Sequence, residues 1–307
     1  MMHFPVYFNA LFIYNLFVFV NIFLRNFLLM KIVSPAKVNL FLHVTGRRPD
    51  GYHTIRSLMC CVSLYDNLTF DFSAPEITVA CNHPDVPENE SNIAYRAARC
   101  FLDALHQNGG VAITIQKHIP VAAGLGGGSS NAATVLLEMN ARWGYPFSMA
   151  QLKHLGLSLG ADVPFFIFRK PALASGIGEH LDLWNDMRPY RLVLVHPRIH
   201  ICTADVYKNL NLGLTKCEQK HKSSPLNIGF NPCRHLCNDL ETVTVLWHPE
   251  IAEIKNRLLS HGAAGALMSG SGPTVFGIFE EADAAKNAFS ALSTDGSSAC
   301  FLVRILL

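Results

Sequence analysis

The sequence predicts an α+β protein of two domains. The chain has 307 residues, half of them hydrophobic, and a domain typically takes roughly 100–200 residues. Apolar runs typical of strands and helical stripes follow one another without a regular βαβ rhythm, which favours α+β over a doubly wound α/β fold. We place the boundary near residues 175–190. The expected domains are then residues 30–185 and residues 186–307, with residues 1–29 outside the fold.

Composition excludes several classes of protein. Charged residues make up 16% of the chain, below the roughly 25% of a typical soluble protein, so disorder is excluded. The 25 basic and 23 acidic residues nearly cancel, whereas a nucleic-acid binder normally carries a basic excess. No repeat period is sustained, which excludes coiled coils, collagens and solenoids. We therefore expect no nucleic-acid partner.

The nine cysteines are scattered and odd in number, unlike a disulfide framework in a chain of this length. Most have apolar neighbours, and we expect reduced thiols that act as small core residues. Cys233, His235 and Cys237 could suggest a metal site, but the pair of cysteines lacks a second pair at zinc spacing. The sequence therefore predicts no dedicated metal site.

The first 29 residues pose a separate question. Arg25 is their one formal charge, and the apolar run over residues 4–24 is long enough to span a bilayer. A signal anchor, a membrane tether and a misplaced start codon are all open. Three asparagines interrupt the run and no cleavage site follows, while Met30 offers an alternative start directly before a strand-like segment. We favour the misplaced start and expect a cytoplasmic protein, with a membrane partner only if residues 1–29 are made.

In the first half, residues 38–44 form an apolar run that predicts a buried strand. Apolar residues at helical spacing predict a helix over 92–105. The same reasoning gives strands at 59–72 (one or two), 77–80 and 111–115, and helices at 129–139 and 149–159.

The second half begins with a strand at residues 192–195. Residues 211–235 are polar and broken by glycine and proline, which predicts a long surface connection. Helices are then expected at 249–260 and 281–292, and strands at 264–268, 274–279 and 300–305.

The most informative segment is residues 120–130, PVAAGLGGGSS, between a predicted strand and a predicted helix. Glycine lets backbone amides approach an anion closely, and the helix start adds unsatisfied N–H groups with partial positive charge. Two serines could cap the helix or bond phosphate oxygens. The segment predicts a phosphate-binding loop, made by Pro120, Val121, Ala122, Ala123, Gly124, Leu125, Gly126, Gly127, Gly128, Ser129 and Ser130.

Other interpretations of this loop are less favoured. A Walker A loop would end in Gly-Lys-Ser/Thr, and the loop has no lysine. A dinucleotide fingerprint needs an acidic residue about 20 positions after the glycines, where Ser148 stands. A hinge or a tight packing turn remains the structural alternative. A second stretch at 269–273, SGSGP, is either a hairpin turn or a loop that supports the first from the other domain.

The loop and two further segments together resemble the GHMP kinase superfamily. The segments are 34–40 (SPAKVNL) and 269–273, and the similarity extends through 50–54 (DGYHT), 160–164 (GADVP) and 238–241 (NDLE). It covers residues 31 to about 305. The last three segments are similar to those of members that phosphorylate the 2-hydroxyl of a cytidyl diphosphate alcohol. The resemblance implies a ribosomal-S5-like ATP domain followed by a ferredoxin-like domain, with ATP as a substrate accompanied by Mg²⁺.

By the same resemblance, Lys37 and Asp162 form the catalytic pair. Asp162 would accept the hydroxyl proton as general base, and Lys37 would balance the charge that develops on the transferred group. Each has a structural alternative, since the lysine could extend its amine to solvent or pair with a structural acid, and the aspartate could cap a turn.

The resemblance also assigns binding residues. Tyr52 and His53 would hold the cytosine base, Asn39 the region of the reacting hydroxyl, and Thr203 the cytidine side, although Thr203 could be a helix cap. Asn92 would lie near the adenine. The alternative functions are another kinase of the superfamily, of mevalonate or homoserine type, and a membrane-tethered nucleotide-binding module without catalysis.

Overall fold

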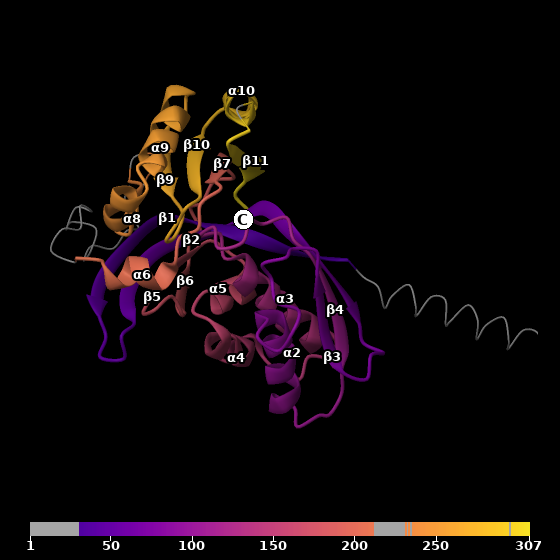
Figure 1. The fold of residues 1–307 in the computed structure, drawn as a ribbon. Helices are drawn as coiled ribbons and strands as arrows, with labels where there is room; N and C mark the ends of the chain where they lie inside the picture. The colour runs from indigo at the N-terminus through magenta and orange to yellow at the C-terminus, as the bar shows by residue number, and fades with distance from the viewer. Residues whose placement is uncertain (1–30, 212–230, 232, 234, 295) are drawn as a thin grey trace, which may run out of the picture.

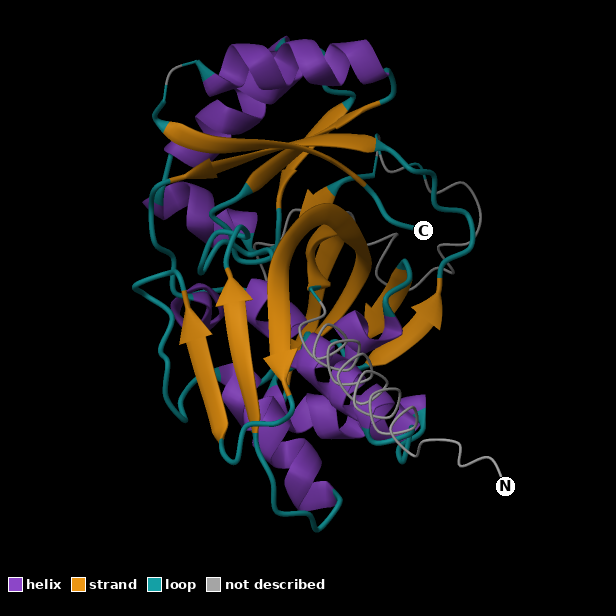
Figure 2. Cartoon of the chain, turned by 90° about the vertical axis from the view of Figure 1, so that its right-hand side faces the viewer, coloured by secondary structure: helices purple, strands orange, loops and turns teal. Residues whose placement is uncertain are grey.

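The computed structural model describes residues 31–211, 231, 233, 235–294 and 296–307. The predictions for residues 1–29 and for most of 211–235 therefore lie outside the described residues. The described elements form two sheets, each with helices packed on it (Figures 1 and 2), which confirms the α+β class. No described helix is both long and apolar enough to cross a bilayer.

The larger sheet is built on a long antiparallel pair, β1 and β2. Its strand order is β3-β4-β2-β1-β8, with β5 paired to β2 and β6 paired to β5. Helices α2, α3, α4 and α5 gather below it (Figure 1). The bounds are β1 (Ile32–Arg47), β2 (His53–Asp71), β3 (Ile77–Cys81), β4 (Val111–Gln116), β5 (Ala172–Ser175), β6 (His180–Leu183), β8 (Cys237–Asn238), α2 (Ile93–Ala104), α3 (Gly127–Arg142), α4 (Met149–Leu159) and α5 (Val163–Phe168).

The smaller sheet is antiparallel, with the order β11-β7-β10-β9. Helices α9 and α10 pack against it (Figure 1). The bounds are β7 (Arg191–Pro197), β9 (Gly265–Met268), β10 (Val275–Phe279), β11 (Ser298–Arg304), α6 (Thr203–Lys208), α8 (Glu241–Trp247), α9 (Glu250–Ser260) and α10 (Ala282–Ser293). The boundary that we predict at residue 185 falls between β6 and β7, although the later strand β8 joins the larger sheet beside β1.

Three clusters of buried side chains hold the layers together. The first lies between the larger sheet and α2 to α5, and the third lies between the smaller sheet and its helices. The second contains Ala36, Val38 and Leu40 of β1 together with Leu194 of β7 and Phe276 of β10, so it joins the two sheets. The two sheets therefore share an apolar interface, and it includes the outward face of β1.

The predicted elements are present, with differences at their ends. Strand β2 is one continuous strand, where the sequence predicts either one strand or two. Strand β1 begins at Ile32 rather than near residue 38. Helix α2 has Asn92 as its N-cap, whose Oδ1 accepts from the amide of Ala94. The short elements α5, α6, α8, β5, β6 and β8 have no counterpart in the predictions.

The prediction that the thiols are reduced is wrong at one described position. Cys237 is disulfide-bonded, whereas the other described cysteines are not in disulfides. An odd, scattered set of cysteines argues against a framework of several bridges, but it leaves room for a single pair.

Candidate active site

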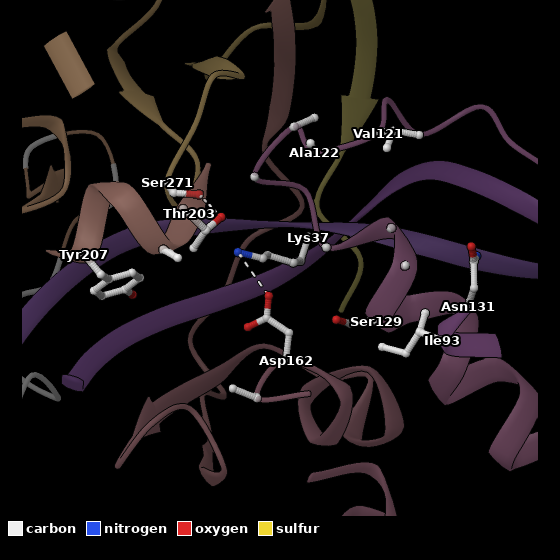
Figure 3. A pocket seen from close by; sticks show the side chains of 18 of the residues that line it. Lys37, Ile93, Val121, Ala122, Ser129, Asn131, Asp162, Thr203, Tyr207 and Ser271 are labelled. Atoms are coloured by element: carbon white, nitrogen blue, oxygen red, sulfur yellow. Dashed lines mark hydrogen bonds and ion pairs between the residues drawn. The ribbon is translucent and has the colours of Figure 1, made fainter. Parts of the chain in front are cut away.

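A cavity of about 1080 Å³ opens where the glycine loop, β1 and α6 meet. Its wall includes the loop at 120–129, the β1–β2 connection around residues 47–53, and Gly270 and Ser271 of the second glycine stretch. Figure 3 shows Lys37 and Asp162 between Tyr207 on one side and Ile93, Ser129 and Asn131 on the other. The cavity therefore brings together segments that are far apart in the sequence.

Lys37 reaches this cavity from the middle of β1. Residues alternate between the two faces of a strand, so Lys37 and Asn39 face the cavity while Val38 faces the core between the sheets. The Lys37 side chain is only 5% exposed, and its Nζ donates to Asn39 Oδ1 at 2.5 Å and lies 3.7 Å from Asp162 Oδ2. It is therefore buried beside the cavity and does not extend to bulk solvent.

Asp162 stands directly before α5, with its side chain 36% exposed. Although it occupies the N-cap position, it makes no side-chain capping hydrogen bond. Its carboxylate lies in the cavity wall beside Lys37 (Figure 3). The structure thus argues against a purely capping role for this residue.

The glycine loop turns sharply at left-handed residues. Gly124 has φ of +75°, and a Cβ there would lie 2.1 Å from the carbonyl oxygen of Ser269, so only glycine fits. Gly126, with φ of +70°, is the N-cap of α3 and offers no side chain to cap it. Helix α3 consequently begins at Gly127, two residues before the predicted start, and the serines do not cap it.

Nine of the eleven predicted loop residues line the cavity; Leu125 and Ser130 do not. Leu125 is buried, and its carbonyl accepts from the Lys37 amide at 2.9 Å. Ser130 is also buried, in hydrogen-bond contact with Ser34 at 2.7 Å. These two residues fix the loop to β1, and the other nine face the space.

The second glycine stretch packs directly on the first. Ser269 Oγ donates to the Gly124 carbonyl at 3.0 Å, and the Thr274 amide donates to the Ala123 carbonyl at 3.3 Å. Gly270 and Ser271 reach the cavity wall. Of the two interpretations of this stretch, the contacts favour support of the glycine loop, and the stretch also contributes to the cavity.

A group of buried polar side chains anchors the start of α3 to the larger sheet. Lys117 Nζ donates to Asp66 Oδ2 at 2.5 Å, and Asn131 Nδ2 donates to Asp66 Oδ2 at 3.0 Å and to Ser34 Oγ at 3.1 Å. Asp66 is fully buried and also accepts from two backbone amides. Because its partners satisfy this buried carboxylate, the group stabilises the base of the loop.

The opposite end of the cavity is aromatic. The rings of His53 and Tyr207 lie 5.2 Å apart at a tilt of 32°, and Tyr52 is exposed at the rim. Burial, and then the positive charge of Arg47, lower the pKa of His53. Burial, and then the negative charge of Asp162, raise the pKa of Tyr207 well above its usual value. Near pH 7 this end therefore presents a neutral imidazole and a protonated phenol.

Thr203 and Asn92 both line the cavity, at different ends. Thr203 is the first residue of α6 and not its N-cap, and its Oγ1 lies 2.7 Å from Ser271 Oγ. Asn92 Nδ2 donates to the Pro87 carbonyl at 2.6 Å while its Oδ1 caps α2. Its polar atoms are thus engaged within the protein, and its contact with an adenine stays a prediction.

The sequence reasoning missed several cavity residues. Tyr207 contacts the site across the fold, and Lys117 lies in a strand-to-loop segment without a motif of its own. Tyr207 carried one usable signal, since it stands four residues after Thr203 and so lies on the same face of α6.

Among the described residues, one group of side chains could hold a metal ion by proximity: His43, Cys237 and Asp239. The Cys237 sulfur is in a disulfide and offers no thiolate. Asp239 Oδ2 accepts from the amide of Val44 at 2.8 Å, outside the cavity. The group is part of the junction between β1 and β8.

Comparison with known proteins gives a consistent picture. The family described as GHMP kinases N terminal domain matches residues 92–170, and GHMP kinases C terminal matches residues 229–298. A 4-diphosphocytidyl-2-C-methyl-D-erythritol kinase from Syntrophus aciditrophicus is 50% identical over 277 residues, which cover 90% of this chain and 99% of that relative. One from Pelobacter propionicus is 47% identical over 260 residues, 84% of this chain and 92% of that relative.

Solved structures agree with the fold. A crystal structure of 4-(cytidine 5'-diphospho)-2C-methyl-D-erythritol kinase matches with a TM-score of 0.72 and 34% identity, over 90% of this chain and 99% of that one. Homoserine kinase from Cytophaga hutchinsonii matches with a TM-score of 0.73 but 18% identity, over 91% and 94%, and shares the fold alone. On the identity and coverage of its relatives, the chain belongs to the 4-diphosphocytidyl-2-C-methyl-D-erythritol kinase family of GHMP kinases, which are small-molecule kinases.

Proposed function

We propose that this chain transfers the γ-phosphoryl group of ATP to the 2-hydroxyl of 4-diphosphocytidyl-2-C-methyl-D-erythritol, a step of non-mevalonate isoprenoid precursor synthesis. The observation that carries the proposal is the order of groups along one cavity. Ser129 of the glycine loop lies on one side of Lys37 and Asp162, and Tyr207 lies on the other side (Figure 3). The ring of His53 contacts that of Tyr207 and lines the same cavity. Two nucleotide-bearing substrates could meet at the central pair.

The glycine loop is the proposed ATP site. Glycines and the start of α3 offer backbone N–H groups to phosphate oxygens, with the helix dipole favouring negative charge. Asn92 and the apolar Ile93 line the same end of the cavity, where the adenine would lie. Mg²⁺ would come with ATP, and the hydroxyl oxygen of Ser129, which faces the same space (Figure 3), suits this hard cation. The ion would neutralise charge on the phosphates.

Lys37 and Asp162 are the proposed catalytic pair. Asp162 would take the proton from the 2-hydroxyl as the oxygen attacks the γ-phosphorus and ADP leaves. The ammonium of Lys37, 3.7 Å from Asp162, lies where negative charge develops on the transferred group. A positioned base of this kind contributes about 10²–10⁴ in rate, and phosphoryl transfer depends chiefly on such positioning and charge stabilisation.

The aromatic end is the proposed cytidine site. The neutral imidazole of His53 can donate to or accept from the edge of a base, and the rings of Tyr52 and Tyr207 offer faces for stacking. Asn39 would contact the substrate near the reacting hydroxyl, and Thr203 the cytidine side. Because both substrates are charged and water-soluble, a cytoplasmic location is part of the proposal.

Turnover with alternative acceptors tests this function. Purified protein is assayed for ADP release with the diphosphocytidyl alcohol, with mevalonate and with homoserine. Turnover of the first alone supports the proposal. Preference for mevalonate or homoserine would assign another kinase of the superfamily, and ATP binding without turnover of any acceptor would assign a nucleotide-binding module.

A further inference from the structure

Lys37, the proposed catalytic lysine, is the end of a chain of hydrogen bonds that runs away from the cavity. Its Nζ donates to Asn39 Oδ1, and Asn39 Nδ2 donates to Ser57 Oγ at 2.8 Å. Ser57 Oγ in turn donates to the Phe41 carbonyl at 2.7 Å. Ser57 is fully buried and does not line the cavity, whereas Lys37 and Asn39 do. We propose that Ser57 is a positioning residue that fixes the orientation of the Asn39 amide and, through it, the place of the Lys37 ammonium.

The direction of each hydrogen bond in this series follows from the donor hydrogens that each group carries. A serine hydroxyl has one hydrogen, and here it is used on the Phe41 carbonyl. Towards Asn39 the Ser57 oxygen can then only accept, so the amide nitrogen must face Ser57 and the amide oxygen must face Lys37. The reversed amide would aim N–H groups at an ammonium, which has three donors and no acceptor. One orientation therefore satisfies every group.

The local backbone explains how Ser57 reaches the Phe41 carbonyl. Asn39 pairs with Met59 and Phe41 pairs with Leu58, so Leu40 is an extra residue in β1, a β-bulge. A bulge bends its strand and redirects side chains, and bulges are common beside active sites. Beyond it, Ser57 pairs with Leu42 of β1 and with Ala174 of β5. The hydroxyl therefore joins β2 to the bulged part of β1.

This inference rests on the proposed kinase function, because it assigns Ser57 a task in placing Lys37. Removing the hydroxyl in Ser57→Ala leaves the Asn39 nitrogen without its partner and frees the amide to turn. A lost hydrogen bond to a group that orients a charge corresponds to about a 10-fold change in an equilibrium or rate constant. We therefore expect kcat to fall about 10-fold, with the KM for ATP changed less than about 2-fold. Ser57→Thr keeps the hydroxyl on a residue that suits a strand, and we expect it to retain kcat within about 3-fold.

A double-mutant cycle separates this task from a merely structural one. If Ser57 acts through Asn39, Ser57→Ala should cost less than about 2-fold in kcat in an Asn39→Ala background. Multiplicative losses, or a normal kcat in Ser57→Ala, would overturn the inference. The matched control is Thr244→Val in α8, which removes a fully buried hydroxyl that also donates to a backbone carbonyl. It should lower stability and leave kcat unchanged.

Two further measurements cover the remaining outcomes. If Ser57→Ala does not fold, Ser57→Cys keeps the size of the side chain while weakening both hydrogen bonds, and its kcat should fall in the same cycle. Crystal structures of wild type and the variant test the chain of bonds without any acceptor, and unmoved Asn39 and Lys37 side chains would overturn the inference. Wild-type protein that does not phosphorylate the cytidyl alcohol would reject the proposed function alone.

Discussion

Gly128→Ala should stabilise the protein while weakening its binding of ATP. Gly128 is exposed in the first turn of α3 and lines the cavity. A Cβ built there meets only Ile93 Cγ2 at 3.6 Å, an ordinary contact, and its φ lies outside the left-handed range. The protein itself thus has room for the methyl group. The space that the methyl group would fill is the space that we assign to phosphate.

The two effects have opposite signs. Alanine in place of a helical glycine contributes about 0.5–1 kcal/mol to the free energy of unfolding, which raises Tm by roughly 1–4 °C in a chain of this size. A methyl group that keeps phosphate from one backbone amide forfeits a charge-assisted hydrogen bond of about 1.5–3 kcal/mol, or about a 10- to 150-fold weaker Kd. Gly126→Val would be a poorer test, because its Cβ would lie 2.8 Å from the Phe166 ring.

Calorimetry with a non-hydrolysable ATP analogue measures the affinity, and thermal unfolding measures the stability. The matched control is Gly109→Ala, at an exposed loop glycine whose Cβ would meet nothing within 4 Å. It should leave the affinity for the analogue unchanged, because Gly109 does not line the cavity. A stabilised Gly128→Ala protein with wild-type affinity for the analogue would remove the glycine loop from the ATP site.

Three further predictions concern the catalytic pair, Tyr207 and the buried His196. Asp162→Asn keeps the shape of the side chain but cannot accept the proton, so kcat should fall by about 10²–10⁴ with ATP affinity unchanged. In the double variant with Lys37→Ala, steady-state kinetics should show a loss of kcat far smaller than the product of the two single-variant losses. Tyr207→Phe keeps the ring that contacts His53 and should nearly retain the KM for the cytidyl substrate, whereas Tyr207→Ala should raise this KM. Equal KM values for the two variants would contradict a stacking role. Burial lowers the pKa of His196 from 6.5 to about 4, so the unfolded state binds more protons than the folded state between these pH values. The free energy of unfolding should therefore fall as pH drops through that window. Chemical denaturation of His196→Gln should show a smaller fall over the same window, and an identical fall would exclude His196 as the cause.

The extent to which the fold could be predicted depends on how local its signals are. Helix α2 was predicted to within one residue at each end, because its apolar stripe and the capping residue Asn92 are both written in consecutive sequence. The start of α3 was missed because its N-cap, Gly126, works by a left-handed backbone and not by a side chain. The short α6 and β8 depend on tertiary contacts, which override weak local preference.

The site divides in the same way. Lys37, Asp162 and the glycine loop come from segments with recognisable patterns, and the structure brings them to one cavity. Tyr207 is an ordinary residue type in a segment without a motif, and Ser271 lies in a glycine stretch for which the sequence predicts no place in the cavity wall. Their place in the wall follows from the packing of α6 and the second glycine stretch around β1. Long-range contacts of this kind leave no periodic trace in one sequence.

The bulge at Leu40 shows why predicting a buried strand at residues 38–44 did not yield the site. Strict alternation from Lys37 and Asn39 would turn Phe41 into the cavity and Leu42 into the core between the sheets. In the structure Phe41 is buried in that core and Leu42 lines the cavity, because the extra residue shifts the register by one. Residues 38–42, VNLFL, are nearly all apolar, so the hydrophobic pattern does not decide which of Phe41 and Leu42 faces the cavity and which faces the core. The choice is made by partners outside the strand, and the hydrogen bond from Ser57 to the Phe41 carbonyl is one of them.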